Sequence, residues 1–214
     1  MLDDDFAYAD DEGIYLVKLA RRSLETYLET GKKIDVPSDF PGKLKDQSGV
    51  FVTLRRHGVP HDSSLRGCIG MIEAREPLIN GVINMALSSG LEDPRFPEVK
   101  KKELDNITFE VTAMTPPKLL EVEDPEDIPA KIKIGRDGII MERGFRRGLL
   151  LPQVPVEQDP VWSPTEFLDY TCRKAWLSQG CWKSKETKVY TFQGEIFEEI
   201  EPRGDIKRKI ITDS

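Results

Sequence analysis

The sequence predicts an α+β fold, and three observations support this. The chain has 214 residues, of which 38% are hydrophobic and 32% charged, a composition typical of a folded, water-soluble protein. Its apolar residues follow helical spacing in some segments and alternate in others. The alternating segments are joined by hairpin-type turns rather than by regular helical crossovers, which favours α+β over a doubly wound sheet.

The first half of the chain predicts helices and strands in mixed order. A helix is expected over residues 11–30, ended by Gly31, and residues 34–49 form a long connection rich in proline and charge. The further elements expected in this half are strands at Gly49–Arg56 and Leu65–Glu73, a helix at Pro77–Ser89 and a half-buried strand at Asn106–Thr115.

The second half contains the best-marked helix start. Ser163, Pro164 and Glu166 form a capping box with proline in the first turn, which predicts a helix running to about Ser178. Residues 1–200 are expected to form one domain. The strands expected here are Lys131–Ile134, Ile139–Glu142, Leu149–Gln153 and one or two within Val189–Ile200, followed by a charged tail at 201–214.

Charge limits the possible partners and location. Lysine and arginine total 31 against 38 acidic residues, and the net charge of −7 argues against broad binding of a nucleic-acid backbone. The longest charge-free stretch, 77–91, is too short to span a membrane, and the acidic residues 1–5 do not resemble a secretory signal. A cytoplasmic protein is therefore expected, and the high lysine and glutamate content favours a heat-adapted source.

The three cysteines, Cys68, Cys172 and Cys181, show no disulfide-framework spacing and are expected to be free thiols. His57 and His61 precede Cys68, but the spacing matches no zinc pattern, so no metal is expected. A catalytic pairing of Cys68 with either histidine stays open, because such partners need only be close in space.

The segment Leu65–Gly70 is the most unusual in the chain. On a strand, Arg66, Cys68 and Gly70 would share one face. An arginine beside a cysteine favours the thiolate, and Gly67 and Gly70 would leave backbone amides open to a ligand. The alternative is a structural cysteine whose neighbouring glycines allow close packing.

A second candidate is the stiff loop Asp93–Pro97. It places the carboxylate of Asp93, the guanidinium of Arg95 and the ring of Phe96 on a scaffold that two prolines restrict. These groups are suited to binding a ligand. A salt-bridged corner would explain them equally well.

Further cations lie in the second half of the chain. Arg143, Arg146 and Arg147 occupy a glycine-bounded turn, where they could bind a phosphate or carboxylate or simply be solvated. Lys174 follows Cys172 in the capped helix, and Cys172 is expected in the core.

The chain resembles the AMMECR family, in its single-domain archaeal or bacterial form, from about Asp11 to Ile200. Four ordered motifs carry the resemblance: Leu65–Gly70, Asp93–Val99, Leu150–Val154 and a helix containing Phe167, Leu168, Cys172, Lys174 and Ala175. The resemblance implies mixed or mostly antiparallel sheets with flanking helices, in two subdomains around a cleft. It also implies that Leu65–Gly70 is the functional site. Trp176 departs from the small residue expected after Ala175.

Three functional hypotheses follow. The first is an enzyme or enzyme subunit that binds a small anionic ligand, with Cys68 as thiolate or contact, Arg66 and Arg95 as anion clamps, and Asp93 as orienter or base. The further ligand-binding candidates are Gly67, Gly70, Phe96, Arg147, Gln153 and Lys174. The second is a non-catalytic protein-interaction module, and the third a role with RNA. The resemblance implies Memo-type and radical-SAM partners in a modification or redox pathway, and no particular cofactor is indicated.

Overall fold

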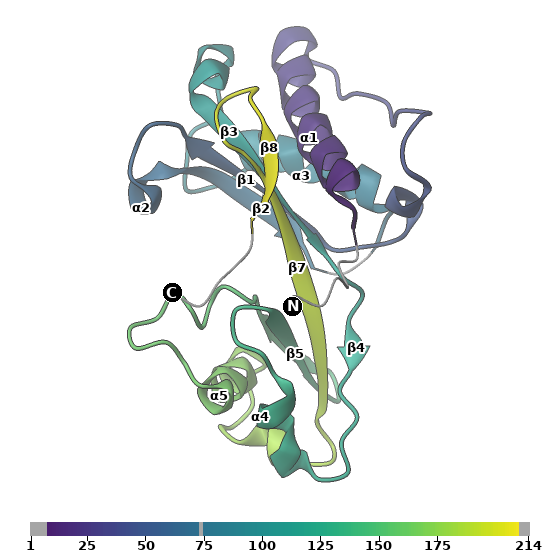
Figure 1. The fold of residues 1–214 in the computed structure, drawn as a ribbon, viewed down its shortest axis with the longest axis vertical. Helices are drawn as coiled ribbons and strands as arrows, with labels where there is room; N and C mark the ends of the chain where they lie inside the picture. Colours follow the sequence, from purple (N-terminus) through teal and green to yellow (C-terminus); the bar gives the residue numbers. More distant parts are fainter. Residues whose placement is uncertain (1–7, 73–74, 210–214) are drawn as a thin grey trace. The chain divides into compact units, whose positions relative to one another are not determined.

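The computed structural model describes residues 8–72 and 75–209, which fall into two compact units (Figure 1). Unit 1 contains the described residues up to 114 together with 195–209, and unit 2 contains 115–194. Strand β7 (Lys188–Glu199) begins in unit 2 and ends in unit 1. The acidic start at residues 1–5 lies outside the described residues.

Unit 1 is a sheet with strand order β2-β1-β3-β7-β8 and two long helices. Strand β1 pairs antiparallel with both β2 and β3, and β8 pairs antiparallel with β7. The elements of this unit besides β7 are α1 (Asp10–Thr30), η1 (Gly42–Lys45), β1 (Val50–Arg56), α2 (His61–Ser64), β2 (Leu65–Met71), α3 (Leu78–Leu91), η2 (Lys101–Asn106), β3 (Ile107–Met114) and β8 (Ile206–Lys209).

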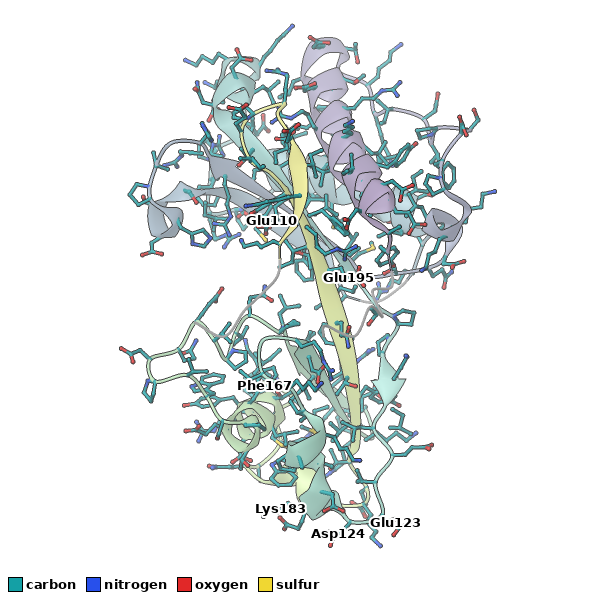
Figure 2. All side chains as sticks on the ribbon, viewed as in Figure 1. Glu110, Glu123, Asp124, Phe167, Lys183 and Glu195 are labelled. Carbon is teal, nitrogen blue, oxygen red and sulfur yellow. A yellow bond between two sulfur atoms is a disulfide. The ribbon has the colours of Figure 1, made fainter. Side chains whose placement is uncertain are left out.

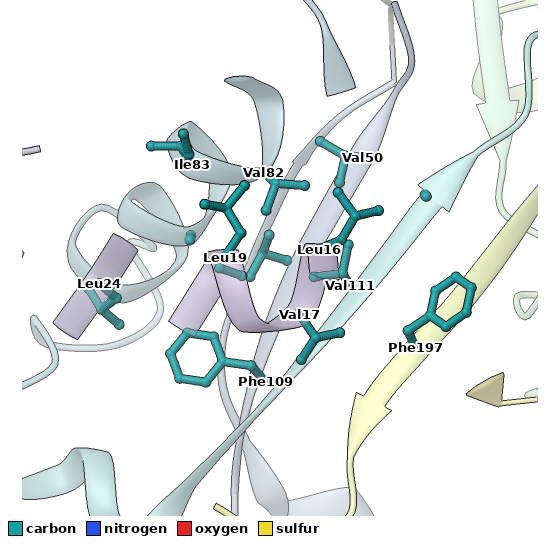
Figure 3. Packing of buried hydrophobic residues seen from close by; sticks show 14 of the residues in the cluster. Leu16, Val17, Leu19, Leu24, Val50, Val82, Ile83, Phe109, Val111 and Phe197 are labelled. Carbon is teal, nitrogen blue, oxygen red and sulfur yellow. The ribbon is translucent and has the colours of Figure 1, made fainter. Parts of the chain in front are cut away.

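The core of unit 1 lies between the sheet and helices α1 and α3 (Figure 3). Alternate residues of β1 and β3, such as Val52 and Val111, are fully buried there against Leu16 of α1 and Val82 of α3. Because alternate side chains of a strand share a face, both helices cover the same face. The other side chains of β1 and β3, including Thr53, lie on the opposite face.

Unit 2 is a smaller sheet in the order β4-β7-β5-β6, packed against α5. Its core includes Phe167 of α5, labelled in Figure 2, and Ile139 and Met141 of β5, all three of which are fully buried. The elements of this unit besides β7 are β4 (Lys118–Leu119), η3 (Pro125–Asp127), α4 (Ile128–Lys131), β5 (Asp137–Arg143), β6 (Arg146–Leu150), α5 (Pro164–Lys174) and η4 (Cys181–Lys183).

The predicted α+β class is confirmed, as are the first hairpin and the capped helix. Ser163 Oγ accepts a hydrogen bond from the Glu166 amide at 3.3 Å, and the Glu166 carboxylate accepts one from the Ser163 amide at 2.8 Å. The expectation that α5 would reach Ser178 is wrong, because Trp176 has a left-handed backbone conformation with φ of 59°. No helix within 8–72 and 75–209 has the length and apolar character that crossing a bilayer requires.

Three other expectations need correction. The strand predicted at 131–134 is absent, since α4 ends at Lys131 and Ile132 packs in the unit 2 core. Cys172 and Cys181 are not free thiols but form a disulfide. Residues 201–209, expected as part of a charged tail, form a turn and strand β8 paired with β7, while 210–214 lie outside the described residues.

Candidate functional site

The candidate site in unit 1 is built around Cys68, in the middle of edge strand β2. Cys68 is opposite Thr53 of β1, and Gly70 is opposite Phe51. The register shifts between Leu54 and Arg55. Because of this bulge Arg66 has no partner in the register, and the simple alternation that placed it beside Cys68 is interrupted.

The loop after α3 holds the outer edge of β2 at Cys68. Asp93 accepts a hydrogen bond from the Cys68 amide at 2.8 Å, and Arg95 Nη2 donates one to the Cys68 carbonyl oxygen at 3.1 Å. The same two side chains pair with each other, Nη2 to Oδ2 at 2.7 Å and Nε to Oδ1 at 2.9 Å. The carboxylate and guanidinium thus take the place that a neighbouring strand would occupy.

These contacts engage both carboxylate oxygens of Asp93. It is buried, and the Arg95 guanidinium, with smaller contributions from the amides of Cys68 and Arg95, holds the pKa of Asp93 well below its ordinary value. A carboxylate that stays ionised and fully engaged is a poor proton acceptor near neutral pH. Of the two roles expected for Asp93, the geometry fits the orienter.

Arg95, rather than Arg66, is the cation near the thiol. The pKa of Arg95 is raised, first by its hydrogen bond to Asp93 and to a smaller extent by the side chain of Cys68. The Arg95 side chain is 53% exposed, and its guanidinium lies 5.6 Å from the centre of the Phe96 ring. Arg95 can therefore present positive charge to solvent beside Cys68.

Arg66 is buried and turned toward Glu103. Its Nε and Nη2 donate to the Glu103 carboxylate at 2.9 and 3.2 Å, and its guanidinium lowers the pKa of Glu103. Its third nitrogen, Nη1, is buried without a hydrogen-bond partner in the described part of the chain. The guanidinium also lies 6.0 Å from the centre of the Phe96 ring. Phe96 therefore lies near both predicted anion clamps, Arg66 and Arg95.

The thiol itself lies on the sheet face opposite the helices, among residues that sequence reasoning missed. Thr53 Oγ1 donates to Cys68 Sγ at 3.3 Å. Thr53 is in turn opposite Glu110 of β3, which is buried and is labelled in Figure 2. Arg55 Nε and Lys209 Nζ lie 3.9 and 3.2 Å from the Glu110 carboxylate. A thiol, a hydroxyl and a carboxylate thus form one row across three strands. The signal that could have found Thr53 and Glu110 was their alternation with core residues in β1 and β3.

The two glycines of the motif are explained by packing. A side chain at Gly67 would collide with the Ser89 carbonyl of α3, and one at Gly70 would collide with the Phe51 ring. Ser89 Oγ also donates to the carbonyl of Val52 and accepts from the Ile69 amide, so α3 is joined to both strands. This observation favours the packing interpretation for both glycines.

Comparison with known proteins now places the chain in a family, since residues 17–197 match AMMECR1. The chain belongs to the AMMECR1 family. Protein PH0010 of Pyrococcus horikoshii is 53% identical over 204 residues, covering 95% of this chain and 98% of that protein. A protein of Methanothermobacter thermautotrophicus is 49% identical over 189 residues, covering 88% and 95%.

The fold of this AMMECR1-family chain also has a solved counterpart. The crystal structure of uncharacterized protein PH0010 from Pyrococcus horikoshii superimposes with a TM-score of 0.81, covering 96% of this chain and 100% of that one. These relatives come from heat-loving archaeal genera, which agrees with the heat-adapted source that the lysine and glutamate content favours.

Three residues singled out for ligand binding lie in unit 2 and are described apart from the Cys68 cluster. Arg147 pairs with Glu142 on β5 at 3.1 Å. Gln153 lies in the loop after β6, where its carbonyl accepts a hydrogen bond from the Glu157 amide. Lys174 is exposed at the end of α5.

The histidines take no part in the Cys68 cluster. His57 lies in the turn after β1 and His61 begins α2, and within the described residues the thiol of Cys68 has Thr53, not a histidine, as its hydrogen-bond partner. The cysteine–histidine pairing that the sequence left open is not formed. Within 8–72 and 75–209, no group of three metal-ligating side chains could hold an ion.

Proposed function

We propose that this AMMECR1-family protein is an enzyme or enzyme subunit that binds a small anionic molecule beside the Cys68 thiol. Arg95 would hold the negative charge, Asp93 would position Arg95 and the Cys68 backbone, and the thiol would contact the ligand. Arg66, whose guanidinium also lies near the Phe96 ring, would assist. Glu110 and Thr53, on the thiol side, would orient the thiol or exchange a proton with it.

One observation carries this proposal: the half-exposed Arg95 guanidinium is fixed to the backbone of Cys68, whose thiol is itself partly exposed. A guanidinium held by a buried carboxylate loses little freedom on binding an anion. The unpartnered Nη1 of Arg66 adds support, because a buried N–H without an acceptor is costly and an anionic ligand could provide one.

The test compares two alkylating reagents at Cys68, the negatively charged iodoacetate and the neutral iodoacetamide. The other two of the three cysteines form a disulfide, so unreduced protein reports on Cys68 alone. The rate with iodoacetate is divided by the rate with iodoacetamide, and this ratio is divided by the same ratio in denatured protein. The normalised ratio should be roughly two to five, because one exposed ion pair contributes up to about 1 kcal/mol.

Variants identify the cation responsible. Arg95→Gln should return the ratio to about one, and Arg95→Lys should retain part of it. Arg22→Gln removes an exposed arginine of α1 and serves as the control that leaves the ratio unchanged. A ratio of one in the native protein, or a raised ratio that survives Arg95→Gln, would refute the anion site.

The cellular setting is a separate proposal that comes from the family resemblance. We propose that the protein acts in the cytoplasm beside a Memo-type or radical-SAM protein. Co-purification of the two proteins at their natural expression levels would support this, and failure of the purified pair to associate at micromolar concentration would count against it.

A further inference from the structure

Trp176, just beyond the end of α5, has an unusual backbone conformation for its side chain. Its φ is 59°, in the left-handed region where helices usually end on glycine. Its indole is 85% exposed, so it contributes little to packing. A bulky residue in a strained conformation with no gain in the core is a sign of function rather than of folding.

The backbone that carries Trp176 is held firmly. The disulfide between Cys172 and Cys181 closes the loop that contains it. Its amide donates to the Arg173 carbonyl at 3.0 Å, and its own carbonyl accepts from Arg146 Nη1 at 2.7 Å. The indole is therefore presented to solvent from a fixed position.

Arg146 connects this loop to a second exposed aromatic residue. Phe145 occupies the tip of the β5–β6 hairpin, beside Gly144 with φ of 60°, and is 97% exposed. Arg146 follows directly in the chain and reaches the Trp176 carbonyl. The hairpin tip and the end of α5 thus belong to one surface of unit 2.

The same surface is basic. Arg146, Arg173 and Lys174 are all exposed, and the guanidinium of Arg173 lies over the Tyr170 ring at 4.9 Å. The nearby carboxylate of Asp169 is occupied by the Gly180 amide and the Trp182 indole N–H. We define the basic aromatic patch as Phe145, Arg146, Arg173, Lys174 and Trp176.

We propose that the basic aromatic patch docks an acidic segment of a partner protein, with an apolar side chain of the partner against Trp176 and Phe145 and its carboxylates on the three cations. This inference goes beyond the Cys68 site and does not depend on it. Tryptophan and arginine dominate the energetics of protein interfaces, and rigid aromatic anchors lose little entropy on binding.

Charge decides between classes of partner. A cationic surface on a chain of net charge −7 is complementary to an acidic protein segment. Nucleic-acid backbones are generally bound by a larger number of cations, in proteins whose overall charge does not oppose them. An acidic peptide is therefore the occupant that the composition of the patch favours.

The test is selection of random 12-residue peptides displayed on phage against the whole protein, with counter-selection on a Trp176→Gly/Arg146→Glu double variant. The enriched peptides should be acidic and carry a large apolar residue. A synthetic peptide from this set should bind roughly tenfold more weakly to Trp176→Gly and to Arg146→Glu. Lys185→Glu reverses another exposed cation of unit 2 and should change binding less than about twofold.

Trp176→Gly also separates docking from a structural role. Glycine tolerates the left-handed conformation, so the thermal midpoint should stay the same or rise while peptide binding falls. The proposal would be overturned if the enriched peptides had no acidic bias, or if they bound the double variant as well as the wild type. It would also be overturned if Trp176 and Arg146 bound poly(U) or phosphatidylserine vesicles and not peptides, or if the protein formed a dimer that Trp176→Gly dissociates.

Discussion

Replacing Asp93 by alanine should lower the free energy of unfolding by about 1–3 kcal/mol. Asp93 accepts hydrogen bonds from the Cys68 amide, from the Arg95 amide and from two guanidinium nitrogens of Arg95. Loss of the two amide partners costs about 1–2 kcal/mol. The ion pair adds no more than about 1 kcal/mol, because Arg95 is half exposed and water competes for it.

The stabilisation should depend on pH in a defined direction. Because the pKa of Asp93 is lowered in the folded protein, its contribution is fully present above the ordinary carboxyl pKa of about 3.9 and is lost as pH falls toward the folded value. The difference between wild type and the uncharged Asp93→Asn should therefore be largest near neutral pH and should shrink below about pH 4.

Urea unfolding of the wild type and the two variants at pH 7 and pH 3 measures these effects. Asp35→Ala removes an exposed carboxylate and should change stability by less than about 0.5 kcal/mol. A cost below about 0.5 kcal/mol for Asp93→Ala at pH 7, or a difference between wild type and Asp93→Asn that grows at pH 3, would refute the role assigned to Asp93.

Two further substitutions test the packing of unit 1. Gly67→Ala places a methyl group against the Ser89 carbonyl of α3. It should lower the free energy of unfolding in urea by about 1–3 kcal/mol, whereas an unchanged stability would show that α3 can move away. Glu199→Gln removes the charge that pairs with the buried Arg21 at 2.5 Å. In urea unfolding it should lower the free energy of unfolding by about 3–5 kcal/mol, and a loss under about 1 kcal/mol would show that water reaches the pair.

The sequence predicted correctly those elements whose formation depends on neighbouring residues. The capping box at Ser163 and the alternation in β3 depend on neighbouring residues, and both were confirmed. The alternation of Ile132 and Ile134 had the same appearance but resulted from a short helix followed by a turn. The disulfide could not be predicted, because pairing of Cys172 with Cys181 depends on how the chain turns after α5.

The candidate site was predictable in its parts but not in its arrangement. The sequence singled out Cys68, Asp93 and Arg95, and the structure brings them together. It did not indicate Thr53 or Glu110, because strand register decides which residues face each other across a sheet.

Protection of the Cys68 thiol by small anions tests the proposed site most directly. The rate of iodoacetamide labelling would be measured with phosphate, sulfate, acetate or pyrophosphate, at constant ionic strength set by potassium chloride. At least one anion should slow labelling in a saturable manner, and Arg95→Gln should remove the protection while Arg22→Gln retains it. Labelling that none of the four anions slows at about 100 mM, or protection that persists in Arg95→Gln, would contradict an anion site at Cys68.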